Sequence, residues 1–218
     1  MNKTNEIGIG LMARAPEVGR VKTRLAATLG DEQATAIYCD LLKNVSAYIT
    51  HATKKLSDIN VTFYWFVEPE AAIELMKKEY PGFDGYLPQV AGDLGQRMKQ
   101  ALATLLEKHK HAALIGADIP DISAEHIAQA YMALKDHDVV FGPTHDGGYY
   151  LIGVNSPYDV LFEEIPWSAS NTLQKSVAAC QRAQLRYDLL EPMGDLDVLE
   201  DFRRIRWRPS SVNVEIPE

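Results

Sequence analysis

Short apolar runs alternate with segments of helical period along most of this chain. The apolar runs are rich in β-branched or aromatic residues and cover 7–13, 61–67, 112–116, 139–141, 149–154 and, more weakly, 185–190. Between them, apolar residues recur every three or four positions over 31–51, 70–80, 94–110, 123–135, 171–184 and 197–206. This alternation predicts an α/β fold with a mostly parallel sheet between helices, and with ligands bound beyond the carboxyl ends of the strands.

Two further features complete the expected architecture. The runs at 139–141 and 149–154 are separated by a short glycine-containing segment with no room for a crossover helix, so we expect an antiparallel pair within the sheet. A chain of 218 residues fits one domain over 1–218, with an irregular tail over 207–218. The residues expected to cap the first turns of predicted helices are Asp31, Ser123 and Asn171.

The overall charge argues against a nucleic-acid partner. The chain has 22 Lys and Arg against 30 Asp and Glu, a net charge of −8, which favours a small-molecule partner over a phosphate backbone. Its two cysteines, Cys39 and Cys180, build neither a disulfide framework nor a C-x-x-C metal site, which fits a reducing compartment. The run at 7–13 is too short to span a bilayer and lacks a signal-peptide pattern. We therefore expect a cytoplasmic protein without a membrane span.

A basic segment follows the first apolar run. Residues 14–24 contain the single acid Glu17 and four cations, namely Arg14, Arg20, Lys22 and Arg24. Pro16 and Gly19 favour a turn that lets backbone approach a ligand, and Arg and Lys side chains suit the oxygens of a phosphate chain. The alternative is a solvated basic loop with cations at a helix start, but cations are unfavourable there unless an anion is present. We predict a diphosphate site.

Neither of two common phosphate motifs explains this segment. Residues 8–13 match G-x-G-x-x-A by letter, but they lie inside the first predicted strand and run into Pro16 instead of a helix. The chain also contains no G-x-x-x-x-G-K-[ST] sequence. We therefore reject both the dinucleotide-binding and the P-loop interpretations.

An acidic segment follows the buried run at 112–115. It places Asp118 at the carboxyl edge of a central strand, where Mg²⁺ or Mn²⁺ is commonly held by one or two carboxylates and completed by phosphates. The alternative is that these acids only cap a turn before the helix at 123–135. We favour that alternative for Asp121 and the metal for Asp118.

The segment over 142–153 contains an Asp-Gly-Gly turn. Such dipeptides are ordinary in hairpins, but if both strands lie in one sheet, Asp146 reaches the same rim as Asp118. Gly147 and Gly148 would leave room for a substrate to contact backbone N–H groups. Tyr149 and Tyr150 alternate in direction, so one of them would line the pocket. We assign the acceptor side to Gly147, Gly148, Tyr149 and Trp167.

A second acidic pair lies near the C-terminus. Asp197 is placed to cap the final predicted helix, which alone explains it. Asp195 is the better candidate for an outward carboxylate and is proposed as a second metal ligand beside Asp118.

Five motifs together resemble one family in order and spacing. They are Ala15-Pro16 with the G-R-V-K-T-R-L-A run over 19–26, G-A-D-I-P-D over 116–121, Gly-Pro and D-G-G-Y-Y-L-I-G over 142–153, Trp167-Ser168, and D-L-D over 195–197. They resemble the bacterial radical-SAM/selenodomain-associated transferase family, within the nucleotide-diphospho-sugar transferase superfamily of GT-A fold, whose relatives include molybdenum cofactor and phospholactate guanylyltransferases. The resemblance implies a mixed sheet between helices, a nucleotide on the loop after the first strand and a divalent metal on Asp118. The chain departs from the family pattern at Glu17-Val18, where a proline usually precedes the glycine, and at Val198, where Thr is usual.

These residues support three hypotheses of function. The leading one is metal-dependent glycosyl transfer from a nucleoside diphosphate sugar to a small acceptor, with Asp146 as base or further metal ligand. The alternative is nucleotidyl transfer from a nucleoside triphosphate to a phosphorylated acceptor, which needs the same metal and cations but no protein base. The third is a nucleotide-binding regulator without chemistry.

Overall fold

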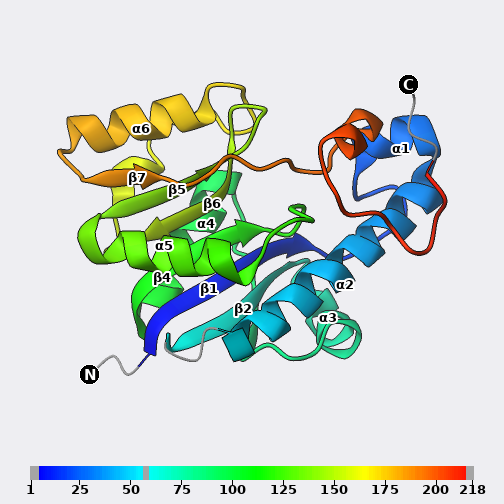
Figure 1. The fold of residues 1–218 in the computed structure, drawn as a ribbon, viewed down its shortest axis with the longest axis horizontal. Coiled ribbons are helices and arrows are strands. Elements are labelled where there is room, and N and C mark those ends of the chain that lie inside the picture. Colours follow the sequence, from blue (N-terminus) through cyan, green and yellow to red (C-terminus); the bar gives the residue numbers. More distant parts are fainter. Residues whose placement is uncertain (1–4, 56–58, 215–218) are drawn as a thin grey trace.

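The described part of the protein contains one seven-stranded sheet. A computed structural model describes residues 5–55 and 59–214 (Figure 1). The strands are β1 (Asn5–Arg14), β2 (Val61–Glu68), β3 (Gly85–Pro88), β4 (His109–Gly116), β5 (Val139–Pro143), β6 (Tyr149–Val154) and β7 (Tyr187–Leu189). Their order in space is β3-β2-β1-β4-β6-β5-β7, and only β6 runs antiparallel to its neighbours among these strands. The mixed, mostly parallel α/β sheet expected from the alternation is confirmed.

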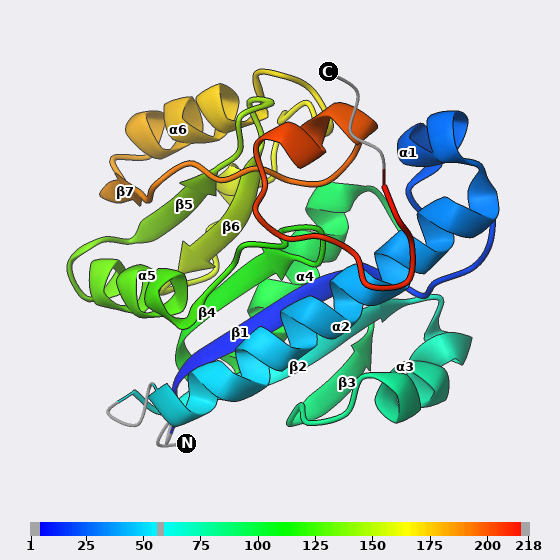
Figure 2. The same ribbon diagram turned by 45° about the vertical axis from the view of Figure 1, so that its right-hand side comes forward.

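Helices cover both faces of this sheet. They are α1 (Thr23–Leu29), α2 (Asp31–Lys55), α3 (Ile73–Glu79), α4 (Leu94–Leu106), α5 (Ala124–Asp136) and α6 (Thr172–Arg182), with 3₁₀ turns at Glu70–Ala72, Asp159–Leu161 and Leu199–Arg203. Helices α2 and α5 pack on one face, and α4 and α6 pack on the other (Figures 1 and 2). None of the described helices is long and apolar enough to cross a membrane.

The side chains of β1 alternate between the two faces. Ile7 and Ile9 are fully buried on the side of α2 and α5. On the other side, a Cβ at Gly8 would lie 2.5 Å from His109 Cδ2, and one at Gly10 would lie 2.7 Å from Leu114 Cδ2. These glycines make room for neighbouring side chains, so the G-x-G letters reflect strand packing and not a dinucleotide site.

The structure differs from the sequence expectations at short elements. Strand β3 and helix α1 are not predicted, because four residues ending in proline and seven residues of one helix give too little periodicity. The helix expected over 197–206 is reduced to the 3₁₀ turn Leu199–Arg203. Among the expected caps, Ser123 is the N-cap of α5 and Asn171 holds the N-cap position of α6 without a side-chain bond, whereas Asp31 is already the first residue of α2.

The C-terminal segment crosses the face covered by α2 and α5 and approaches α1 (Figure 2). The Asp40 carboxylate accepts hydrogen bonds from the backbone N–H groups of Ser210 (2.7 Å) and Ser211 (2.6 Å). Asp121 accepts bonds from the N–H groups of Arg206 and Trp207, so its role is structural, but it holds the C-terminal segment, whereas we expected it to cap the turn before α5. Residues 207–214 have no regular structure, and the end of the predicted tail, 215–218, lies outside the described residues.

Candidate active site

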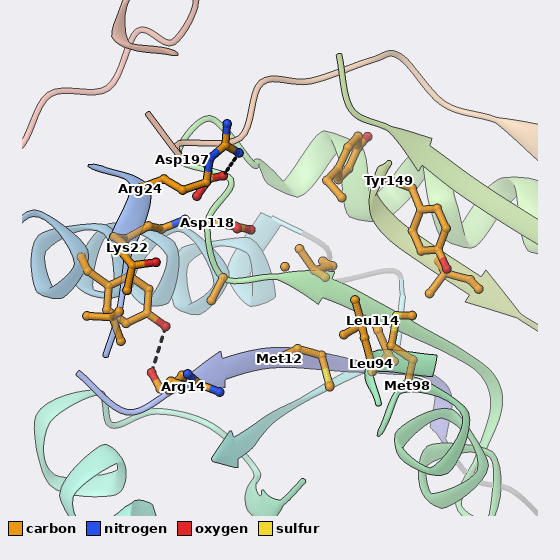
Figure 3. Close-up of a pocket in the computed structure, with 18 of the residues that line it drawn as sticks. Met12, Arg14, Lys22, Arg24, Leu94, Met98, Leu114, Asp118, Tyr149 and Asp197 are labelled. Atoms are coloured by element: carbon orange, nitrogen blue, oxygen red, sulfur yellow. Dashed lines mark hydrogen bonds and ion pairs between the residues drawn. The ribbon is translucent and has the colours of Figure 1, made fainter. Parts of the chain in front are cut away.

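A cavity of about 460 Å³ opens at the carboxyl ends of β1 and β4 (Figure 3). Polar side chains gather at one end of it, and they include Arg14, Lys22, Arg24, Asp118 and Asp197. The other end is apolar and is lined by Met12, Leu94, Met98, Leu114 and Tyr149. The cavity therefore combines a charged rim with an apolar floor, which is the form expected of a small-molecule site.

Lys22 and Asp118 meet across this cavity. Lys22 precedes α1 in a left-handed conformation (φ 46°, ψ 44°), and its side chain is only 9% exposed. Its Nζ lies 3.3 Å from Oδ2 of Asp118, which follows β4 and is 40% exposed. A non-glycine residue rarely adopts this conformation unless its surroundings hold it there. The basic segment and the acid after β4 are thus brought to one rim, as their positions after neighbouring parallel strands predict.

The other cations of the basic segment also have carboxylate partners. Arg14 lies 3.2 Å from Glu68, Arg20 lies 3.2 Å from Glu17, and Arg24 contacts Asp197. All four cations line the cavity. Asp197, expected to cap a helix, instead pairs with Arg24, and it is Asp201 that accepts bonds from the N–H groups of Asp197 and Val198.

Gly19 shapes the turn before these cations and does not line the cavity itself. Its φ of +77° lies in the left-handed region, which favours glycine. A Cβ at this position would lie 3.4 Å from Asp31 Oδ2. Gly19 therefore directs the chain of the loop, whereas its contact with a phosphate stays a prediction.

Three acids approach one another beside the cavity. Asp118, Asp146 and Asp195 all line an adjoining space of about 250 Å³. Burial, together with the charges of Asp118 and Asp146, raises the pKa of Asp195 to about 6. Carboxylates crowded in this way suit a hard divalent cation with oxygen ligands. Among the described residues, no three His, Cys, Asp or Glu side chains are grouped closely enough to hold a metal ion.

The turn between β5 and β6 uses its own polar groups. Asp146 Oδ1 accepts bonds from Thr144 Oγ1 (2.5 Å) and from the Gly148 N–H (3.0 Å), and the Gly147 N–H donates to the Thr144 carbonyl (3.2 Å). The Gly147 and Gly148 N–H groups are therefore bonded within the turn, and their contact with a substrate stays a prediction. A Cβ at Gly147 would lie 1.9 Å from the Ser170 carbonyl oxygen, so this glycine is needed for close packing.

The aromatic residues near the acceptor side contact other parts of the core as well as the cavity. Both Tyr149 and Tyr150 reach the cavity, although we expected only one to do so. Tyr149 packs on Phe141 on the α4 side, and burial raises the pKa of its phenol. Tyr150 faces the other core, and burial raises its pKa to about 12. Trp167 lies against the N-terminal turn of α4, where a Cβ at Gly95 would lie 2.5 Å from its Nε1.

Sequence reasoning missed the contribution of α4. Leu94 and Met98 line the cavity, and Gly95 admits Trp167. A usable signal was present, because Asp93 and Gln96 form a reciprocal capping box that marks the start of this helix. The apolar residues themselves are indistinguishable from core residues in a helical pattern.

The chain is similar to curated guanylyltransferases. It is 24% identical over 191 residues to the 2-phospho-L-lactate guanylyltransferase of Methanocaldococcus sp. (strain FS406-22), which covers 86% of this chain and 77% of the relative. The same named enzyme of Methanocaldococcus jannaschii is also 24% identical, covering 86% of this chain and 78% of the relative.

Solved structures share the fold. A protein of Desulfovibrio desulfuricans G20, provisionally named a nucleotide-diphospho-sugar transferase, superposes with a TM-score of 0.79 and 29% identity, covering 91% of this chain and 85% of that one. The 4-diphosphocytidyl-2C-methyl-D-erythritol synthase of Anaerococcus prevotii DSM 20548 gives a TM-score of 0.58 at 11% identity, covering 91% and 95%, which shows the fold alone.

The fold and these relatives define an enzyme of the transferase class with the fold of nucleotide-diphospho-sugar transferases. Residues 52–169, more than half of the chain, match the family described as "Uncharacterized protein conserved in bacteria (DUF2064)". The protein belongs to that family.

Proposed function

We propose that this protein is a nucleotidylyltransferase that moves a nucleoside monophosphate from a nucleoside triphosphate to a phosphorylated small acceptor. The observation that carries this proposal is the meeting of Lys22 and Asp118 on a cavity rimmed by three further cations. Such a rim can hold a phosphate chain whose charge must be neutralised during transfer. The similarity to guanylyltransferases supports this function over glycosyl transfer.

A divalent cation is part of the proposal. Asp118 and Asp195 would hold Mg²⁺ or Mn²⁺, since the crowded carboxylates fit a hard cation and the phosphates can supply its remaining ligands. When bound, the cation supplies charge neutralisation at the phosphate oxygens.

The basic segment binds and orients the phosphates. Lys22 and Arg24 each pair with a carboxylate, and phosphate oxygens would take the place of these carboxylates, while Arg14 adds a further cation to the rim. An oxygen of the acceptor phosphate attacks the α-phosphorus, the bond from that phosphorus to the bridging oxygen breaks, and pyrophosphate leaves with the electron pair. This nucleophile is already an anion, so Asp146 can remain bonded within its turn.

Glycosyl transfer is the second candidate. It is favoured by the structural similarity to the Desulfovibrio protein, and it uses the same phosphate-binding rim. The acceptor hydroxyl in that reaction needs a base, for which Asp146 is the candidate on the acceptor side. We also propose, from the sequence, that the protein is a radical-SAM/selenodomain-associated transferase and that it is located in the cytoplasm.

An assay of the released product separates the candidates. GTP with phosphorylated acceptors and MgCl₂ is expected to release pyrophosphate, while nucleotide sugars with the same acceptors release no nucleoside diphosphate. Asp118→Asn should lower the rate by about 100-fold or more, since it removes charge from the proposed metal site. Asp146→Asn keeps an oxygen that accepts both turn hydrogen bonds, so it should change the rate by less than about fivefold.

Two results would redirect the assignment. Release of nucleoside diphosphate from a nucleotide sugar, abolished by Asp146→Asn with nucleotide binding intact, would favour glycosyl transfer. Tight nucleotide binding without any product would favour the regulator.

A further inference from the structure

A second arginine shares the carboxylate partner of Arg14. Glu68, the last residue of β2, is the register partner of Arg14 on β1, and its Oε2 accepts a bond from Arg14 Nη2 at 3.2 Å. The same oxygen accepts a bond from Nη1 of Arg97 on α4. Arg97 is the more buried of the two arginines, with 24% of its side chain exposed against 50% for Arg14.

This cluster differs in charge from the other pairs of the rim. Arg20 with Glu17, Lys22 with Asp118 and Arg24 with Asp197 are pairs of one cation and one acid. The cluster of Arg14, Arg97 and Glu68 contains two cations and one acid. It therefore carries a net positive charge, and phosphate binding at Arg14 does not require the acid to be displaced.

The surroundings keep the acid of this cluster ionised. Burial raises the pKa of Glu68, but the two guanidinium groups outweigh burial and hold the pKa below its usual value. Arg97 is itself fixed, because its Nε donates to the Gly92 carbonyl (3.0 Å) just before α4. One guanidinium thus links the start of α4 to the ends of β1 and β2.

We propose that Arg97 is a positioning residue of the phosphate site: it offsets the charge of Glu68, so that the positive charge of Arg14 stays available to a phosphate of the nucleotide. This role rests on the proposed function. It predicts that loss of Arg97 weakens nucleotide binding, and that binding is restored when Glu68 also loses its charge.

The test measures GTP binding by titration calorimetry in MgCl₂, with UDP-glucose as a second probe. Arg97→Gln should weaken binding about tenfold, and the Arg97→Gln, Glu68→Gln double variant should return to within about threefold of the wild type. Arg97→Lys should keep most of the affinity, because it keeps the charge. The matched control is Lys99→Gln, which removes a cation from the same helix that pairs with Asp159 instead, and which should leave binding unchanged.

Thermal unfolding of each variant without ligand separates folding from binding. If Arg97→Gln does not fold, Glu68→Gln alone still tests the idea, since it should bind GTP at least as tightly as the wild type. Unchanged binding by Arg97→Gln, a double variant as weak as Arg97→Gln, or weaker binding by Glu68→Gln would overturn this inference and leave the proposed function in place. A wild-type protein that binds neither GTP nor UDP-glucose would overturn both.

Discussion

At the scale of single residues, two glycines that share a positive φ have different roles. Gly147 has a φ of +92° and a neighbour, the Ser170 carbonyl oxygen, 1.9 Å from where a Cβ would lie. Gly30 has a φ of +83°, but nothing lies within 4 Å of its Cβ position. The first glycine satisfies both a conformational and a packing requirement, whereas the second satisfies the conformational one alone.

This pair gives a matched prediction for stability. Gly30→Ala should lower the free energy of unfolding by about 2 kcal/mol through backbone strain, because its φ of 83° and ψ of 157° fall in a region that glycine alone adopts readily. Gly147→Ala adds a clash with backbone and should cost about 3 kcal/mol or more. Urea denaturation of both variants checks this, and equal losses would show that the contact with Ser170 is easily relieved.

Site residues differ in how far the sequence predicts them. Lys22 and Asp118 are predictable, because each follows a buried run and parallel strands bring such ends together. Glu68 and Arg97 are not, because their relation to Arg14 depends on the register of β1 with β2 and on the packing of α4. Asp146 is a third case. Its Asp-Gly-Gly pattern predicts a turn, and bonds within that turn account for the hydrogen bonds of its carboxylate, so the pattern alone does not identify a site residue.

At the scale of elements, periodicity predicts the long helices and central strands, predicts the edge strand β7 only weakly, and misses the edge strand β3. Helices α2, α4 and α5 have clear apolar spacing, and the central strands are nearly continuous apolar runs. Edge strands such as β3 and β7 are short and partly exposed, so tertiary contacts determine them. For β7, one of these contacts is an ion pair.

Asp138 and Arg186 join the start of β5 to the residue before β7. The Arg186 backbone N–H and Nε donate to Asp138 Oδ2 at 2.9 and 3.2 Å, and Nη2 donates to Oδ1 at 3.2 Å. These bonds lower the pKa of Asp138 to about 2, despite the opposing effect of its burial. An unfolded Asp titrates near pH 4, so the pair stabilises the folded state above about pH 4 and loses this effect as the pH falls to about 2.

Asp138→Asn should therefore lower the free energy of unfolding by about 1 kcal/mol at pH 7. The expected loss is small because the Arg186 guanidinium is exposed and solvent screens the ion pair. The loss should shrink as the pH falls from about 4 through about 2, and vanish only below pH 2, where Asp138 is protonated in both states of the wild type. Asp188→Asn in β7, where the carboxylate bonds its neighbour's N–H, is the control. Denaturation at several pH values measures both, and a pH-independent difference for Asp138→Asn would contradict the argument.

At the scale of the whole molecule, a protein of net charge −8 concentrates cations on one rim of its sheet. Carboxylates from β2, from the turn after β4 and from the C-terminal segment pair with these cations. We expect Lys22 and Arg24 to exchange their carboxylate partners for phosphate oxygens, and Asp118 to take a divalent cation.

The most direct measurement of that claim is a thermal-shift series with GTP and UDP-glucose, each with and without MgCl₂. A nucleotide at about 100 times its dissociation constant should add roughly 2.7 kcal/mol of stability, and the gain should depend on Mg²⁺ in the wild type. Asp118→Asn should lose the part that depends on Mg²⁺, and Lys22→Gln should bind more weakly with or without it. An unfolding temperature that neither nucleotide changes, or an equal metal-dependent gain in Asp118→Asn, would contradict the claim.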